Sequence, residues 1–243
     1  MKTLCIDAGN SSIKVAHFEE TSIRSIASFQ RSNDNELFRY LDELPQSDAC
    51  ILASVTSINQ AIVDKLSKKA TYFLELSADT PIPINNLYKT PETLGKDRLA
   101  AVVGAYSLFP DRDILVFDAG TALTIDFIDK DGNYHGGNIS PGLKMRFQAL
   151  NDYAEKLFLQ SQTDNYQLIG DNSASAIVSG VQTGMIFEIK KYIEHFVNIY
   201  KDLVIILTGG DINFFVNKIG NTIFAAPNLV FIGLENIVKF NFK

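Results

Sequence analysis

Two short segments combine a carboxylate, a glycine and hydroxyl groups, which are residue types that hold phosphates and metal ions. The first reads Asp7-Ala8-Gly9-Asn10-Ser11-Ser12-Ile13-Lys14, and the second reads Asp118-Ala119-Gly120-Thr121. Each lies between two apolar, strand-like runs, which predicts a β-hairpin with the acid and the glycine at its tip. A glycine lets the backbone approach a phosphate closely, and an aspartate suits Mg²⁺. The repeat therefore indicates two similar halves facing each other over a cleft, which suits a nucleoside triphosphate with its metal ion.

A third segment, Gly95-Lys96-Asp97-Arg98, opens a predicted helix. Phosphoryl transfer to an alcohol requires a carboxylate that accepts or orients the hydroxyl proton, and Asp97 supplies one. The guanidinium fork of Arg98 suits an anionic group. The alternative is that Asp97 only caps the helix, because an acid in the first turn interacts favourably with the helix dipole.

Two glycine-rich segments give weaker signals. Thr208-Gly-Gly-Asp211 follows a predicted buried strand and leaves room for a flat ring such as adenine. A helix-entry turn with Asp211 as the N-cap also explains it. Gly136-Gly-Asn-Ile-Ser-Pro-Gly142 leads into a helix, and its paired glycines predict a close backbone contact.

The net charge of −6 argues against a nucleic-acid-binding protein, which usually shows a basic face. An acidic protein that binds ATP needs local positive charge from cations, from basic side chains such as Lys14 and from backbone N–H groups. The sequence has no Gly-x-x-x-x-Gly-Lys-Ser/Thr loop, which excludes a P-loop enzyme. The three histidines are scattered and do not form a metal-ligand pattern.

The remaining composition indicates an ordinary globular protein. We expect a cytoplasmic location and no membrane partner, since the N-terminus lacks the layout of a signal peptide and no apolar run reaches the ~18 residues of a membrane span. Cys5 and Cys50 both lie in apolar strand-like runs, which predicts buried free thiols.

The periodicity of the 243 residues predicts an α/β chain of two domains, 1–112 and 113–243, in which a β-β-β-α-β-α order repeats imperfectly. The predicted strands are 3–8, 12–18, 23–29, 49–55, 71–76, 113–118, 122–128, 133–139 and 203–207. The predicted helices are 35–44, 58–69, 96–108, 143–151, 173–200 and 228–242. Two stretches, 79–93 and 160–172, are predicted loops.

The five segments resemble those of the type III pantothenate kinases in residue type and in order along the chain. The resemblance extends over almost the whole chain. The Gly-x-Asp-Arg element together with the Gly-Gly-x-Ile-x-Pro-Gly segment narrows the wider acetate kinase, sugar kinase, Hsp70 and actin superfamily to this family. The resemblance implies two ribonuclease-H-like domains of the actin-like ATPase kind, with mixed sheets around an ATP cleft, and a homodimer. It implies that ATP phosphorylates pantothenate to 4′-phosphopantothenate, the first step of coenzyme A biosynthesis.

The resemblance also implies roles for single residues. Asp97 is the expected general base, and Asp118 is expected to bind a monovalent cation, K⁺ or NH₄⁺, beside the Mg²⁺ that accompanies ATP. The expected ATP-binding residues are Asp7, Ala8, Gly9, Asn10, Ser11, Ser12, Ile13, Lys14 and Thr121. The expected pantothenate-binding residues are Tyr88, Gly95, Lys96, Asp97, Arg98 and Ser173.

Two positions depart from the family pattern, since Ser11 and Ser173 stand where the family usually has threonine. Both keep the hydroxyl, so we expect function to be retained. The alternatives are another small-molecule kinase of the superfamily, a non-catalytic regulatory homologue, and an actin-like filament protein. The presence of Asp7, Asp97 and Asp118 argues against the non-catalytic alternative.

Overall fold

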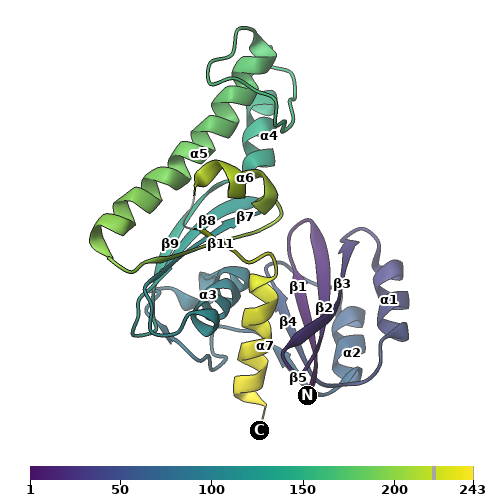
Figure 1. Cartoon of the computed structure of the whole chain (residues 1–243). Coiled ribbons are helices and arrows are strands. Elements are labelled where there is room, and N and C mark those ends of the chain that lie inside the picture. Colours follow the sequence, from purple (N-terminus) through teal and green to yellow (C-terminus); the bar gives the residue numbers. More distant parts are fainter. Residues whose placement is uncertain (221–222, 243) are drawn as a thin grey trace. The chain divides into compact units, whose positions relative to one another are not determined.

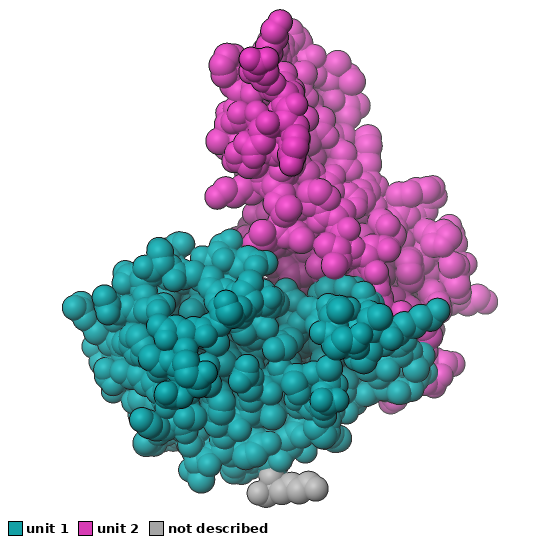
Figure 2. All heavy atoms as spheres, turned by 180° about the vertical axis from the view of Figure 1, so that it is seen from behind, with its two compact units in different colours: residues 1–108, 132–134, 229–243 teal, residues 109–131, 135–228 magenta. Residues whose placement is uncertain are grey.

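The computed structural model describes residues 1–220 and 223–242, and they form two compact units (Figure 2). Unit 1 comprises residues 1–108, 132–134 and 229–243, and unit 2 comprises residues 109–131 and 135–228.

Unit 1 is built on a mixed five-stranded sheet with the order β3-β2-β1-β4-β5 (Figure 1). The first three strands pair antiparallel, and β4 and β5 continue the sheet in parallel. The strands are β1 (Lys2–Ala8), β2 (Ser12–Glu19), β3 (Ser22–Gln30), β4 (Ser47–Ser54) and β5 (Ala70–Glu75). The helices are α1 (Asp34–Glu43), α2 (Gln60–Lys68), the 3₁₀ turn η1 (Pro91–Thr93), α3 (Lys96–Leu108) and α7 (Leu229–Asn241).

Both faces of this sheet are covered, and alternate residues of β1 pack on opposite sides. Leu4 and Ile6 pack with the apolar residues of α1 and α2. Cys5 packs on the other face with α3 and α7. Successive side chains of a strand point to opposite faces, so a strand buried on both sides must be continuously apolar. Burial raises the pKa of Cys5 and of Cys50, and both are free thiols, as predicted.

Unit 2 contains the sheet order β11-β10-β7-β8-β9. The strands are β7 (Ile114–Ala119), β8 (Ala122–Ile128), β9 (Asn133–Pro141), β10 (Val204–Thr208) and β11 (Ile223–Ala225). The helices are α4 (Leu143–Tyr153), α5 (Ser173–Ile199) and α6 (Ile212–Ile219). One apolar cluster joins β7 and β8 to these three helices. The two residues of β6 (Asn85–Asn86) pair with Asn133 and Tyr134, which belong to unit 1.

The two sheets have the same topology. β7 lies between its antiparallel neighbour β8 and its parallel neighbour β10, as β1 lies between β2 and β4. The tips differ by one residue, because Ala8 pairs with Ile13 whereas Ala119 pairs with Leu123. The repeated hairpin predicted from the sequence is therefore the start of a repeated α/β fold.

Helices α3 and α7 pack closely because each has a glycine at the contact. A Cβ added to Gly233 would lie 1.7 Å from the Ala100 carbonyl oxygen, and one on Gly104 would lie 2.4 Å from the Leu229 oxygen. This packing groups α7 with unit 1. The predicted domains 1–112 and 113–243 stay a prediction, and the compact units differ from them mainly in the placement of residues 229–243.

The predicted helices and strands are confirmed, with ends that agree within two residues. The start of helix α6 was predicted only as an alternative, in the helix-entry turn at Asp211, and the short strands β6 and β11 and the 3₁₀ turn η1 were not predicted. Among the described residues, no helix is long and apolar enough to cross a membrane.

Candidate functional site

The first hairpin places Asp7 at the end of β1, directly opposite Lys14 on β2. The N–H of Gly9 donates to the Ser12 carbonyl at 3.0 Å and closes the turn. Asn10 and Ser11 are exposed at the tip. The hairpin therefore presents the polar groups that the sequence predicted for a phosphate site.

Asp7 is held in a low-dielectric position. It points to the sheet face covered by α3 and α7, because Ile6 and Ala8 beside it pack with α1 and α2. Burial raises the pKa of Asp7 to about 6, Lys14 opposes this rise, and the carboxylate of Asp97 adds to it. Asp7 and Asp97, 90 positions apart in the sequence, therefore share one electrostatic environment in unit 1.

Asp97 lies in the first turn of α3, and its carboxylate is oriented by local contacts. Its Oδ1 accepts the Arg98 N–H at 2.8 Å, an interaction that the partial positive charge of a helix N-terminus favours. Gly95 is required for this orientation, because a Cβ there would lie 2.5 Å from Asp97 Oδ1. Helix capping and a catalytic role are thus compatible, since capping fixes the direction of the second carboxylate oxygen.

Arg98 is 5% exposed, and an aromatic stack supports its guanidinium. The guanidinium carbon lies 5.6 Å from the centre of the Tyr88 ring, a cation–π distance. The Tyr88 ring stacks on Tyr134, with centroids 6.2 Å apart and planes 7° from parallel. The Leu87 N–H donates to the Tyr134 carbonyl at 3.0 Å, and this bond fixes the 79–93 loop to the start of β9. The structure therefore brings Tyr88 and Arg98 together.

Tyr134 is a supporting residue that the sequence did not reveal. It is fully buried and reaches Tyr88 through the pairing of β6 with the start of β9. A two-residue strand carries no periodic pattern, so no local signal could have identified this contact.

In unit 2, three of the predicted segments meet at the end of β7. The Asp211 N–H donates to the Ala119 carbonyl at 2.9 Å. Gly209 has φ +98°, and a Cβ there would lie 2.5 Å from Asp118 Oδ1. A Cβ on Gly142 would lie 2.4 Å from the carbonyl oxygens of the Gly120–Thr121 turn. The second hairpin is therefore enclosed by turns that only glycine fits.

The same predicted segments of unit 2 also contain Asp211, Gly137 and Thr121. Burial raises the pKa of Asp211, which precedes α6 as the sequence alternative proposed, although its side chain makes no capping bond. Gly137 provides the predicted close backbone contact, since a Cβ there would lie 1.8 Å from the Ile125 oxygen of β8. Thr121 is exposed at the hairpin tip.

Ser173 lies apart from the second hairpin. It is the first residue of α5, exposed, and follows the N-cap Asn172, whose side chain accepts the Ser175 N–H at 3.0 Å. Helices α4 and α5 form an extended pair, and the start of α5 lies at the end of this pair that is remote from the sheet (Figure 1).

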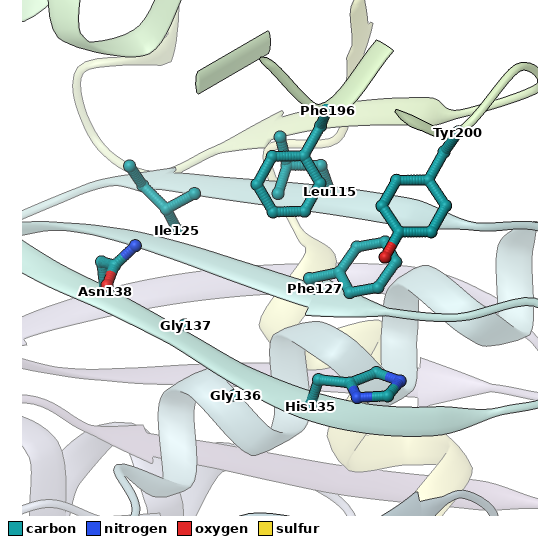
Figure 3. Close-up of a pocket in the computed structure, with 9 residues that line it drawn as sticks. All are labelled: Leu115, Ile125, Phe127, His135, Gly136, Gly137, Asn138, Phe196 and Tyr200. Atoms are coloured by element: carbon teal, nitrogen blue, oxygen red, sulfur yellow. The ribbon is translucent and has the colours of Figure 1, made fainter. Parts of the chain in front are cut away.

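A pocket of about 360 Å³ lies where β7, β8 and β9 meet the last turns of α5 (Figure 3). Aromatic rings dominate it, and the Phe127 centroid lies 4.6 Å from that of Tyr200 and 5.2 Å from that of Phe196. Its lining includes none of the predicted site residues and no lysine or arginine among the described residues. The pocket therefore does not suit phosphate groups.

The described residues contain no group of three histidine, cysteine, aspartate or glutamate side chains that could hold a metal ion. A magnesium ion that arrives with a nucleotide does not require such a group, because it takes one or two carboxylates together with phosphate oxygens and water. Asp7 fits that requirement, since its buried charge is incompletely compensated.

Comparisons with known proteins agree on one family. A family model described as "Type III pantothenate kinase" matches residues 3–195. A type III pantothenate kinase of Phocaeicola vulgatus is 45% identical over 99% of both chains, and one of Bacteroides fragilis is 41% identical over 98% of both.

Solved structures show the fold. A Baf family protein of Campylobacter jejuni superposes with a TM-score of 0.65, 23% identity and 98% coverage of both chains. MreB5 of Spiroplasma citri, bound to ADP, gives a TM-score of 0.52 at 10% identity, covering 100% of this chain and 97% of that one. The predicted fold class, α/β with mixed sheets of the actin-like ATPase kind, is confirmed.

Proposed function

The chain belongs to the family of type III pantothenate kinases, and from this premise we propose which of its residues carry the reaction. Members of this family phosphorylate pantothenate in coenzyme A biosynthesis, with ATP as the co-substrate. The chain is therefore a kinase that transfers a phosphoryl group from ATP to an alcohol. The observation that supports the assignment of residues most strongly is that Asp7, at the end of β1, lies on the sheet face covered by α3, whose first turn carries Asp97.

Asp97 is the proposed general base. Its carboxylate is fixed by the Arg98 N–H and by the space that Gly95 leaves, so one oxygen can accept the proton of the primary hydroxyl of pantothenate. Arg98, supported by Tyr88, supplies a rigid cation for the carboxylate of pantothenate, and Gly95 and Lys96 line the same site.

The 7–14 hairpin is the proposed phosphate site. Asp7 would hold Mg²⁺ directly or through water, while Lys14 and the donors of Asn10, Ser11 and Ser12 bind the phosphate oxygens, and Gly9 leaves room for their close approach. The raised pKa of Asp7 supports this proposal, because a nearby divalent cation offsets the cost of the buried charge. Magnesium supplies charge neutralisation during transfer, and the hairpin holds the γ-phosphoryl group in place.

Asp118 is the proposed ligand of a monovalent cation, K⁺ or NH₄⁺, with Thr121 contacting ATP. The donor set fits a hard cation, since the carboxylate of Asp118 lies beside the backbone carbonyls that surround Gly209 and Gly120. The cation would add local positive charge to a protein of net charge −6.

A homodimer is proposed from the surface of unit 2. Tyr153 at the end of α4 is 92% exposed, and Phe158 and Ile169 in the segment that joins α4 to α5 are 79% and 78% exposed. Phe187 of α5 is 58% exposed. Clustered apolar side chains of this kind mark protein–protein contacts. In such a dimer, Ser173 at the remote end of α5 would serve the pantothenate site of the second copy. A cytoplasmic location without nucleic-acid or membrane partners stays a prediction.

The test is a coupled assay of ADP release with ATP and Mg²⁺. We expect release to depend on pantothenate, and to rise when K⁺ or NH₄⁺ replaces Na⁺ at constant ionic strength. ADP release that does not depend on pantothenate would contradict pantothenate as the substrate. Pantothenate-dependent release that is equal in all three salts would contradict only the cation site.

A further inference from the structure

Arg31 lies beside the tip of the phosphate hairpin. It follows the last residue of β3, Gln30, which pairs with Ser12 at the start of β2. Because β3 runs antiparallel to β2, the chain leaves the sheet at the turn that contains Gly9. The local sequence gives no sign of this neighbour, since 22 positions separate the two residues.

The guanidinium of Arg31 connects two loops. Nη1 donates to the Gly9 carbonyl at 2.9 Å and also to the Thr56 hydroxyl. Nη2 donates to the Ser57 carbonyl at 2.8 Å. A backbone bond reinforces the same junction, because the Val55 N–H donates to the Ala8 carbonyl at 3.2 Å. The half-buried side chain thus fixes the hairpin tip against the loop between β4 and α2.

The bond to Gly9 determines the direction of the next peptide group. In a trans peptide the C=O and the N–H point in opposite directions, and the described residues contain no cis peptide bond. The Gly9 carbonyl points toward Arg31, so the Asn10 N–H points away from it, to the exposed side of the tip. The Gly9 N–H is already used by Ser12, so both polar groups of Gly9 are fixed.

We propose that Arg31 is a positioning residue for ATP, which fixes the Gly9–Asn10 peptide so that the tip's N–H groups face the phosphates. The proposal rests on the assignment of the 7–14 hairpin to ATP phosphates. Arg31 acts through Gly9 and Thr56, without contacting the nucleotide itself. Its planar fork is essential, because one nitrogen reaches Gly9 and the other reaches Ser57.

Two variants distinguish the contribution of the two guanidinium nitrogens of Arg31 from the contribution of its positive charge. Arg31→Lys keeps the positive charge but has a single nitrogen, and Arg31→Gln removes the charge. We expect both to lower kcat/KM for ATP by roughly tenfold to a hundredfold, because small displacements at a reacting group are costly. KM for pantothenate should stay unchanged. Arg24→Lys, on the exposed side of β3, is the matched control and should retain wild-type kinetics.

The measurement is a calorimetric titration with a non-hydrolysable ATP analogue and Mg²⁺, together with steady-state kinetics and thermal melting. Thr56→Val, which removes one acceptor and leaves Arg31 in place, should weaken analogue binding in the same direction but less. It also keeps the proposal testable if an Arg31 variant does not fold.

Three outcomes would overturn the positioning role: wild-type analogue affinity in Arg31→Lys, wild-type affinity in Thr56→Val, or equal losses toward ATP and pantothenate with a lower melting temperature. A wild-type protein that binds the analogue but shows no pantothenate-dependent ADP release would contradict the proposed function alone. Absence of analogue binding by the wild type would contradict both.

Discussion

Replacing Asp7 by asparagine should increase the stability of the protein while abolishing its activity. The carboxylate of Asp7 is largely withdrawn from solvent, and this burial, with a smaller contribution from Asp97, raises its pKa from 3.8 to about 6. Asparagine has nearly the same shape and no charge to bury. The substitution therefore isolates the free-energy cost of keeping an ionised carboxylate at this position.

The size of the effect follows from the two pKa values. Between pH 3.8 and about 6 the folded protein holds the proton more tightly than the unfolded chain does, so the free energy of unfolding falls as pH rises through this range. At about 1.4 kcal/mol per pKa unit, the cost is about 3 kcal/mol at pH 8 and about 1.5 kcal/mol at pH 5.

The assay is urea unfolding of the wild type and of Asp7→Asn at pH 8 and pH 5, without nucleotide. We expect the variant to be more stable at both values, with a gain that is about twice as large at pH 8. Asp79→Asn, which removes an exposed carboxylate from a loop of the same unit, is the control and should show no pH-dependent gain.

A second measurement connects this cost to function. Mg²⁺ and ATP at about 100 times their Kd should stabilise the wild type by about 2.7 kcal/mol. Asp7→Asn should lose most of this stabilisation, because a neutral amide does not replace the carboxylate as a magnesium ligand. A variant that is destabilised equally at both pH values, or that retains full stabilisation by Mg²⁺ and ATP, would refute the reasoning.

Two further substitutions test the catalytic base and the helix contact. Asp97→Asn keeps the acceptor for the Arg98 N–H but cannot accept a proton, so turnover should fall by about 10²- to 10⁴-fold with an unchanged melting temperature, and near-normal ADP release would contradict the assignment. Gly233→Ala should destabilise the protein by about 3 kcal/mol in urea unfolding, because its Cβ would clash with the Ala100 carbonyl. Gly184→Ala in α5, where a Cβ meets nothing within 4 Å, is the control and should be neutral or stabilising.

Much of the site was predictable because its parts are local in sequence. An apolar run, an acid, a glycine and a second apolar run specify a hairpin through contacts between residues a few positions apart. The segments 7–14 and 118–121 both satisfy this pattern, and both form hairpins with the acid at the end of the first strand. The start of α3 is local in the same way, since Asp97 is fixed by Gly95 and Arg98.

Helix α6 has a local pattern in its sequence that is consistent with the helix-entry turn at Asp211. Ile212, Phe215 and Ile219 recur at helical spacing and are buried on one face. The segment is only eight residues long, and a short apolar run does not distinguish a helix from a strand by periodicity alone.

The sequence by itself determined which segments form hairpins and helices and which residue types stand at their tips, because these depend on neighbours along the chain. Only the tertiary structure decided the burial that raises the pKa of Asp7, the stack of Tyr134 on Tyr88, and the bond from Arg31 to Gly9. Each of these depends on burial or on a contact between distant strands and loops. Which residues meet in this way depends on how the strands and loops pack in the folded protein, and no short pattern in the sequence encodes it.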